Sequence, residues 1–134
     1  MSSTDAFFDT NILLYALSKE REKAGRSAEL MRRGGVISIQ VLNEFAVVCL
    51  RKYRTEWSTV RRGLDDLRES FDVVPLTLAT HIRGIALCER FGFGLYDSMI
   101  VAAALDASCH TLWTDGMQEG QVIEGLTIRN PFQH

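Results

Sequence analysis

The sequence has few of the residues that mark disulfide-rich or zinc-binding proteins. Its cysteines, Cys49, Cys88 and Cys109, are odd in number and form no Cys-x-x-Cys pair, and its three histidines show no His-x-x-x-His spacing. An odd set of cysteines among apolar neighbours is typical of reduced, mostly buried thiols. The pattern therefore argues against both a disulfide framework and a zinc site.

Long apolar runs and an excess of positive charge are also missing. The longest uninterrupted apolar run, residues 99–105, is too short to span a bilayer, and the first five residues lack a basic flank and an apolar signal segment. With 15 Lys and Arg against 17 Asp and Glu, the formal net charge is -2, so the chain would not coat nucleic acid indiscriminately. We expect a soluble, cytoplasmic protein without membrane association, in which any affinity for nucleic acid comes from a local patch.

Short apolar segments alternate with longer segments of helical periodicity along the chain. A chain of 134 residues that is 46% hydrophobic can bury one core, so we expect a single domain over residues 1–134. The expected strands cover residues 6–8, 36–39, 72–76, 110–114 and 126–128. The expected helices cover residues 12–17, 20–33, 40–53, 58–70, 80–91 and 98–107. Such alternation predicts an α/β fold, a three-layer α/β/α sandwich with a mainly parallel central sheet.

Four acidic residues lie where apolar segments stop or turn. Asp9 and Asp115 directly follow expected strands, whereas Glu44 and Asp97 lie early in expected helices. In such a sheet the functional site lies at the carboxyl ends of the strands, where these side chains can meet. Like charges gathered in one cleft call for a neutralising cation, and carboxylate oxygens suit Mg²⁺ or Mn²⁺. The pattern predicts a divalent-metal site that hydrolyses phosphodiester bonds.

Each acid taken alone also has an ordinary structural interpretation. Asp9 and Asp97 are good N-cap residues for the helices that follow them, and Asp115 begins an Asp-Gly turn dipeptide. Glu44 shares a strongly apolar helix with Phe45, where a lone charge is costly unless it is paired, coordinated or turned to solvent. No one of the four decides between the two interpretations.

Four segments carry the four acids in order along the chain. They are residues 8–15 (FDTNILLY), 38–45 (SIQVLNEF), 96–104 (YDSMIVAAA), and 112–115 (LWTD) with 118–121 (QEGQ). In this order they resemble the motifs of the PIN domain, specifically the VapC-type toxins of bacterial toxin–antitoxin pairs. The resemblance covers nearly the whole chain and implies a ribonuclease that uses Mg²⁺ or Mn²⁺, is usually a homodimer, and is silenced by a cognate VapB-like antitoxin.

The resemblance also assigns roles to individual residues. Asp9, Glu44 and Asp97 fill the three main acidic positions, with Asp9 and Asp97 as direct metal ligands and Glu44 binding directly or through water. Asn11 and Ser98 would be supporting polar contacts. Many relatives place the fourth acid two positions after a Thr or Ser, which here is Gly116, while the available carboxylate, Asp115, comes one position earlier. The shift leaves open whether a second metal ion binds.

Two other functions compete with the nuclease. An aspartyl-phosphate protein, such as a haloacid dehalogenase-type phosphatase or a receiver domain, would also place an Asp after the first strand. It generally needs a lysine near the later strands, and the only lysines are Lys19, Lys23 and Lys52. The other competitor is a catalytically weakened PIN domain that binds protein or RNA, which the glycine at position 116 would favour.

Overall fold

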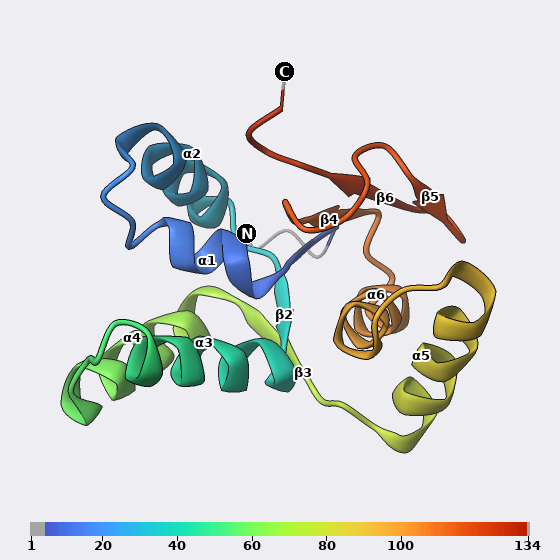
Figure 1. Ribbon diagram of the computed structural model, residues 1–134, viewed down its shortest axis with the longest axis horizontal. Coiled ribbons are helices and arrows are strands. Elements are labelled where there is room, and N and C mark those ends of the chain that lie inside the picture. Colours follow the sequence, from blue (N-terminus) through green and yellow to red (C-terminus); the bar gives the residue numbers. More distant parts are fainter. Residues whose placement is uncertain (1–4, 134) are drawn as a thin grey trace.

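The computed structural model describes residues 5–133, and in that part of the chain strands and helices alternate from end to end. Figure 1 shows the elements in order. The strands are β1 (Ala6–Phe8), β2 (Val36–Ser38), β3 (Asp72–Val74), β4 (Thr111–Trp113), β5 (Val122–Ile123) and β6 (Leu126–Arg129). The helices are α1 (Thr10–Tyr15), α2 (Arg21–Arg32), α3 (Ile39–Arg51), α4 (Trp57–Ser70), α5 (Leu78–Phe91) and α6 (Leu95–Asp106).

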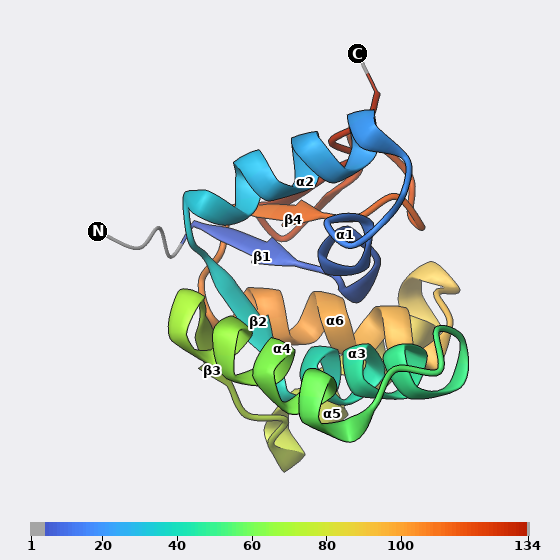
Figure 2. The same cartoon turned by 90° about the vertical axis from the view of Figure 1, so that its left-hand side faces the viewer.

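The strands form one sheet in the order β3-β2-β1-β4-β6-β5. All neighbouring pairs are parallel except β5 and β6. The chain moves outward from β1 to β2 and β3 and then returns to place β4 on the other side of β1. Because crossover connections are right-handed, this reversal places α1–α4 on one face of the sheet and α5 and α6 on the other, as Figures 1 and 2 show. The expected three-layer α/β/α sandwich is confirmed.

The core lies between the sheet and both helical layers. The central strands are short and apolar, and their side chains Phe7, Ile37, Leu112 and Ile128 are fully buried. Helix α6 is apolar on nearly all sides, which fits a helix packed between the sheet and α5. Among the described residues, no helix combines the length and the apolar character needed to cross a bilayer.

Glycine is required where the chain leaves α2 and enters the sheet. Gly35 has a φ of 154°, and a Cβ atom there would lie 2.6 Å from the backbone carbonyl oxygen of Ala6. No side chain fits so close to a backbone atom of the neighbouring strand. The Gly34-Gly35 pair thus ends the helix and also lets β2 lie against β1.

The structure differs from the sequence-based expectations at a few boundaries. Helix α5 begins at Leu78, two residues early, because Thr77 and Thr80 form a reciprocal capping box. Helix α6 begins at Leu95 rather than at residue 98, and Gly94 is its N-cap. Strand β5 was not expected; it pairs with β6 through a tight turn in which Glu124 and Gly125 both have positive φ.

Candidate active site

Asp9 lies at the point where the strand order reverses. It follows β1 and caps α1, and its Oδ1 accepts a 2.7 Å hydrogen bond from the backbone N–H of Thr10. Its Oδ2 accepts a 2.8 Å bond from the hydroxyl of Thr114, which follows the neighbouring strand β4. Ligands of open parallel sheets bind at such a reversal point. Asp9 therefore caps α1 and also lies where a ligand would bind. Its side chain is only 8% exposed.

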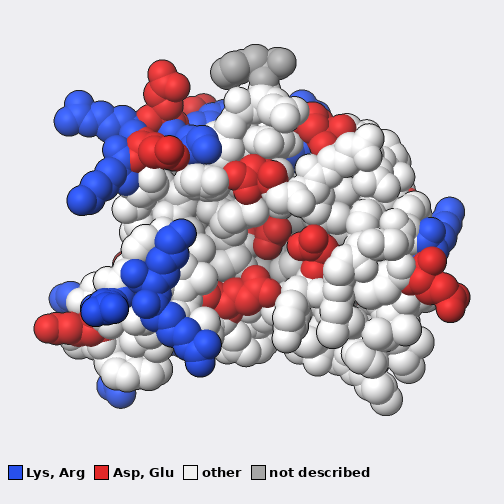
Figure 3. All heavy atoms as spheres, viewed as in Figure 1, with Lys and Arg blue, Asp and Glu red and all other residues white. Residues whose placement is uncertain are grey.

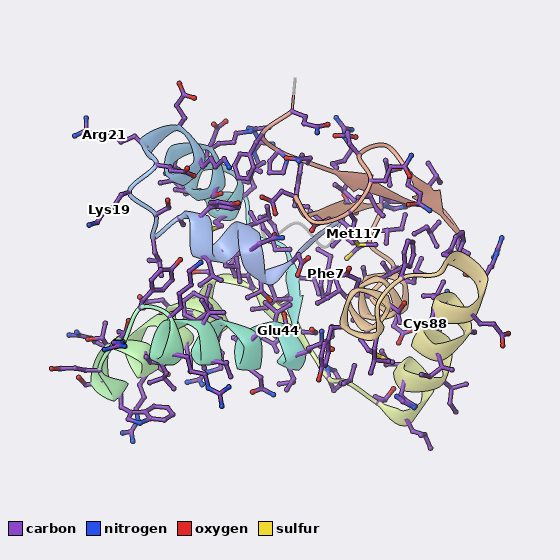
Figure 4. All side chains as sticks on the ribbon, viewed as in Figure 1. Phe7, Lys19, Arg21, Glu44, Cys88 and Met117 are labelled. Atoms are coloured by element: carbon purple, nitrogen blue, oxygen red, sulfur yellow. The ribbon has the colours of Figure 1, made fainter. Side chains whose placement is uncertain are left out.

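Glu44 and Asp97 line the same groove as Asp9. Glu44 comes from α3 and Asp97 from the first turn of α6, so three separate segments bring the carboxylates together. Figure 4 shows Glu44 extending from α3 toward the region between α1 and α6, and Figure 3 shows acidic side chains gathered around a hollow on this face. The other residues that line the groove are Thr10, Asn11, Leu14, Gln40, Asn43, Val47, Val48 and Tyr96.

Glu44 is held by two hydrogen bonds. Its Oε2 accepts a 2.7 Å bond from the hydroxyl of Thr10, and its Oε1 accepts a 3.0 Å bond from the Nε2 of Gln40. Gln40 Nε2 also donates to the backbone carbonyl of Tyr96 at 3.2 Å. The Glu44 carboxylate is thus fixed, rather than turned freely to solvent.

Three residues that orient these acids were not expected from the sequence, namely Thr10, Gln40 and Thr114. A local signal existed for Gln40, because it precedes Glu44 by four residues, the spacing that places two side chains on the same face of a helix. Thr114 had no comparable signal, since its bond to Asp9 joins residues that are 105 positions apart.

Burial and the gathered charges change the acid–base behaviour of the site. Burial, together with the charges of Glu44 and Asp97, raises the pKa of Asp9 to about 6, against the opposing hydrogen bonds from Thr114 and Thr10. Burial and the charge of Glu44 also raise the pKa of Asp97. Mutual repulsion of this kind is what a bound cation relieves.

The two predicted supporting residues, Asn11 and Ser98, each have unused hydrogen-bonding capacity. Asn11 Nδ2 donates a weak 3.4 Å bond to Thr114 Oγ1, while Asn11 Oδ1 is buried without a hydrogen-bond partner. Ser98 Oγ, next to Asp97 in α6, is also buried without one. A buried polar atom without a hydrogen-bond partner destabilises a fold by about 1–3 kcal/mol. Such atoms are tolerated where a bound ligand can supply the missing partner.

Asp115 is placed differently from the other acids. Its Oδ2 accepts a 2.7 Å hydrogen bond from the Tyr15 hydroxyl, and that bond raises the pKa of Tyr15 to about 12. Asp115 does not line the groove that contains Asp9. A Cβ atom on the neighbouring Gly116 would lie 3.5 Å from Nδ2 of Asn11, a residue that does line the groove. The structure therefore brings Asp9, Glu44 and Asp97 together and turns Asp115 toward Tyr15.

The donor set fits a hard cation that keeps part of its water shell. Within residues 5–133, no three or more His, Cys, Asp or Glu side chains have the spacing to hold one ion entirely by themselves. Carboxylate oxygens of Asp9 and Asp97, together with the unpartnered Oδ1 of Asn11, are nevertheless ligands of the type that Mg²⁺ accepts beside retained waters. Asp9 and Glu44 each accept hydrogen bonds on both carboxylate oxygens, and each of those oxygens keeps a second lone pair for a cation or for its water.

Comparison with known proteins places this arrangement in a family. No curated protein gives a significant match. A solved toxin–antitoxin complex from Klebsiella pneumoniae is 27% identical with a TM-score of 0.73, and the match covers 96% of this chain and 99% of that one. VapBC2 from Rickettsia felis, bound to a DNA fragment from their promoter, is 22% identical with a TM-score of 0.67 over 93% of this chain and 97% of that one.

A third similar structure is VapC20 from Mycobacterium tuberculosis, described as a sarcin-ricin loop cleaving toxin. It is 16% identical with a TM-score of 0.64, over 80% of this chain and 86% of that one, a level of identity that supports the fold alone. The family model described as PIN domain matches residues 6–119, a range that contains Asp9, Glu44 and Asp97. The resemblance expected from the motifs is thereby confirmed, and the chain belongs to the PIN domain family.

Proposed function

We propose that the protein is a divalent-metal-dependent ribonuclease that hydrolyses RNA phosphodiester bonds and is the toxin of a VapBC-type toxin–antitoxin pair. The observation that carries the proposal is the convergence of Asp9, Glu44 and Asp97 on one groove at the carboxyl edge of a parallel sheet. The likeness to a toxin–antitoxin complex over nearly the full length of both chains supports the biological role.

In this proposal Asp9 and Asp97 hold Mg²⁺ or Mn²⁺, and Glu44 contacts it directly or through water. Such an ion would supply Lewis-acid polarisation of the scissile phosphate and would make the attacking water more acidic. The chain itself fixes the orientation of its acids: Thr114 and the backbone of Thr10 hold Asp9, and the Thr10 hydroxyl holds Glu44. In-line attack by water would leave a 5′-phosphate, as the resemblance implies.

Asn11, which lines the groove, and Ser98, which follows Asp97 in α6, act as supporting polar contacts, because each has a buried polar atom without a hydrogen-bond partner. Asp115, the remaining acid, is held by a hydrogen bond from Tyr15 and does not line the groove. We therefore expect Asp115 to matter less than Asp9, Glu44 or Asp97, and one tightly held ion to be enough for hydrolysis.

The proposed partners are a single-stranded RNA substrate, a cognate VapB-like antitoxin and a second copy of the chain. Two of the similar structures are complexes of a toxin with its antitoxin, which supports the second of these. A small neighbouring gene that encodes a DNA-binding protein would support the assignment, and co-purification of the two products would test it.

The nuclease proposal is tested on the purified protein with single-stranded RNA in Mn²⁺ and in EDTA. We expect cleavage in Mn²⁺, none in EDTA, and a loss of about 100-fold or more in Asp9→Asn and Asp97→Asn, since each removes a ligand charge from the site. Asp65→Asn is the matched control, because Asp65 is an exposed acid on α4 paired with Arg68. Cleavage that withstands both chelation and Asp9→Asn would contradict the proposal.

A second candidate function is a binding module with little or no cleavage. Gly116 motivates it, because a glycine lies beside Asn11 and Thr114 at the position where many relatives carry the fourth acid. Calorimetry with Mn²⁺ separates the two functions. A folded protein that takes up no Mn²⁺ would favour the binding module.

A further inference from the structure

The groove carries an exposed aromatic side chain that the mechanism above does not use. Tyr96 is 68% exposed, immediately precedes Asp97 in the first turn of α6, and lines the same groove as Asp9 and Glu44. The aromatic ring pairs found in the described part of the chain involve other residues. A large, solvent-facing ring at the edge of a catalytic groove is a surface on which a flat ligand can stack.

The position of Tyr96 is fixed relative to the acids. Gln40 Nε2 donates both to the Tyr96 carbonyl at 3.2 Å and to Glu44 Oε1 at 3.0 Å. One amide group therefore ties the backbone of the exposed tyrosine to one of the proposed catalytic carboxylates. A tyrosine with a fixed backbone has only two side-chain torsions left to order, so a ligand can be held on its ring at small entropic cost.

Helix α3 supplies further residues to the same groove. Asn43 and Val47 are both exposed, lie one turn apart and therefore share one face of the helix. Val47 adds an apolar surface that is 46% exposed, and the Asn43 amide adds both a donor and an acceptor. A ring, an aliphatic side chain and an amide match a nucleobase, which is apolar on its faces and polar along its edge.

We propose that Tyr96 stacks on a nucleobase next to the scissile phosphate of single-stranded RNA, and that Val47 and Asn43 contact the same base. The inference rests on the proposed function in taking RNA as the ligand. Because stacking recognises every base face and the Asn43 amide adds hydrogen bonds along one edge, the subsite gives affinity with modest base preference. Tyr96 is then a substrate-binding residue whose removal acts mainly on KM.

Binding without chemistry is the direct test. We would measure, by fluorescence anisotropy in EDTA and again in Ca²⁺, the affinity of a short single-stranded oligoribonucleotide for the full chain. Loss of one stacked base lowers affinity by about 5- to 150-fold, so we expect a fall of about tenfold or more in Tyr96→Ala. Tyr96→Phe keeps the ring and should stay within about twofold of the wild type.

Trp57→Ala is the matched control, since Trp57 is a 61% exposed aromatic on α4 that does not line the acidic groove. We expect this variant to bind RNA like the wild type. A 5-iodouridine placed at successive positions of the oligonucleotide should photo-crosslink to Tyr96 at one position, and the Trp57→Ala variant should give the same adduct.

The outcomes separate this inference from the proposed function. RNA binding that depends on Tyr96 without cleavage would remove the hydrolysis proposal and leave the base subsite standing. If the wild type cleaves RNA and Tyr96→Ala leaves both the KM and the RNA affinity unchanged, the hydrolysis proposal stands and the base subsite is overturned. A Tyr96→Ala variant that loses self-association, while it keeps its affinity for RNA, would assign the ring to a contact between copies and overturn the subsite. A wild type that binds no RNA would overturn both.

Discussion

The hydroxyl of Thr10 donates a 2.7 Å hydrogen bond to Glu44 Oε2, across 34 positions of sequence. The backbone N–H of the same threonine donates to Asp9 Oδ1 at 2.7 Å. One residue at the start of α1 therefore orients two of the three carboxylates in the groove. This link makes Thr10 a positioning residue for the proposed chemistry.

Replacing Thr10 with valine should test that link. The Thr10→Val variant keeps the backbone bond to Asp9 and the side-chain volume but removes the bond to Glu44. We expect kcat for RNA cleavage to fall about tenfold, because a small misplacement of a catalytic group is costly. Thr10→Ser keeps the hydroxyl and should recover most of the activity. Wild-type kcat in the valine variant, measured in saturating Mn²⁺, would show that the bond plays no positioning role.

The raised pKa of Asp9 gives the metal-free protein a defined pH dependence. The folded pKa of about 6 lies above the ordinary value of 3.8, so the stability due to the protonated form is complete below about pH 4 and is lost as pH rises through 6. Asn mimics the protonated acid and can still cap α1. We expect Asp9→Asn to exceed the wild type in free energy of unfolding by up to about 3 kcal/mol at pH 7, and by little at pH 4.

Denaturant unfolding in EDTA at both pH values measures this difference. Mn²⁺ supplies the internal control, because it should stabilise the wild type at pH 7 and leave Asp9→Asn nearly unchanged. An asparagine variant that is less stable than the wild type at pH 7 in EDTA would rule out the cost of burying a charged Asp9 as the dominant effect at this position.

Much of the fold could be predicted from local signals. The apolar run at residues 6–8 predicts strand β1, and the Gly34-Gly35 pair predicts the end of helix α2. Both features depend only on residues that are close together in the sequence. Strand β5 was missed because Val122 is 61% exposed and its pairing with β6 depends on Glu124 adopting positive φ, which glutamate rarely does.

The site was predictable only as a set of acids. The sequence placed Asp9 at the end of a strand and Glu44 and Asp97 in the first half of helices, and parallel topology brings such positions toward one edge of the sheet. Their orientation depends on contacts between distant residues, such as Thr114 with Asp9 and Tyr15 with Asp115. Sequence spacing does not predict contacts between residues so far apart, so the hydrogen bond between Asp115 and Tyr15 could not be anticipated.

Adding the fourth acid at position 116 should strengthen metal binding. A Cβ atom on Gly116 would lie 3.5 Å from Asn11 Nδ2 and 3.8 Å from Thr114 Oγ1, which is ordinary contact. The Gly116→Asp variant should therefore fold normally and add a carboxylate beside the site. We expect Mn²⁺ affinity by calorimetry to rise about tenfold, in line with the effect of one more charged ligand on a hard cation.

Asp115→Asn is the matched comparison, because it removes the acid that faces Tyr15. We expect this variant to change Mn²⁺ affinity and RNA cleavage by less than about threefold, since an acid outside the coordination sphere acts only through screened charge. A larger loss in Asp115→Asn than in Asp97→Asn would mean that Asp115 turns into the groove when the metal binds.

A pair of glycine substitutions tests how closely β2 must lie against β1. Gly35→Ala would place a Cβ atom 2.6 Å from the carbonyl oxygen of Ala6 at a φ of 154°, and both effects disfavour the folded state. We expect it to lose about 2–4 kcal/mol in free energy of unfolding, because strand separation or local strain must follow.

Gly25→Ala is the matched control, because a Cβ atom there would have no other atom within 4 Å and the residue lies within α2. We expect this variant to gain up to about 1 kcal/mol in free energy of unfolding. Both variants are compared by urea unfolding in EDTA, where metal binding does not contribute. Equal stabilities would contradict the close approach of the two strands, and a Gly35→Ala protein that is destabilised yet still takes up Mn²⁺ would show that the acidic groove tolerates movement of β2.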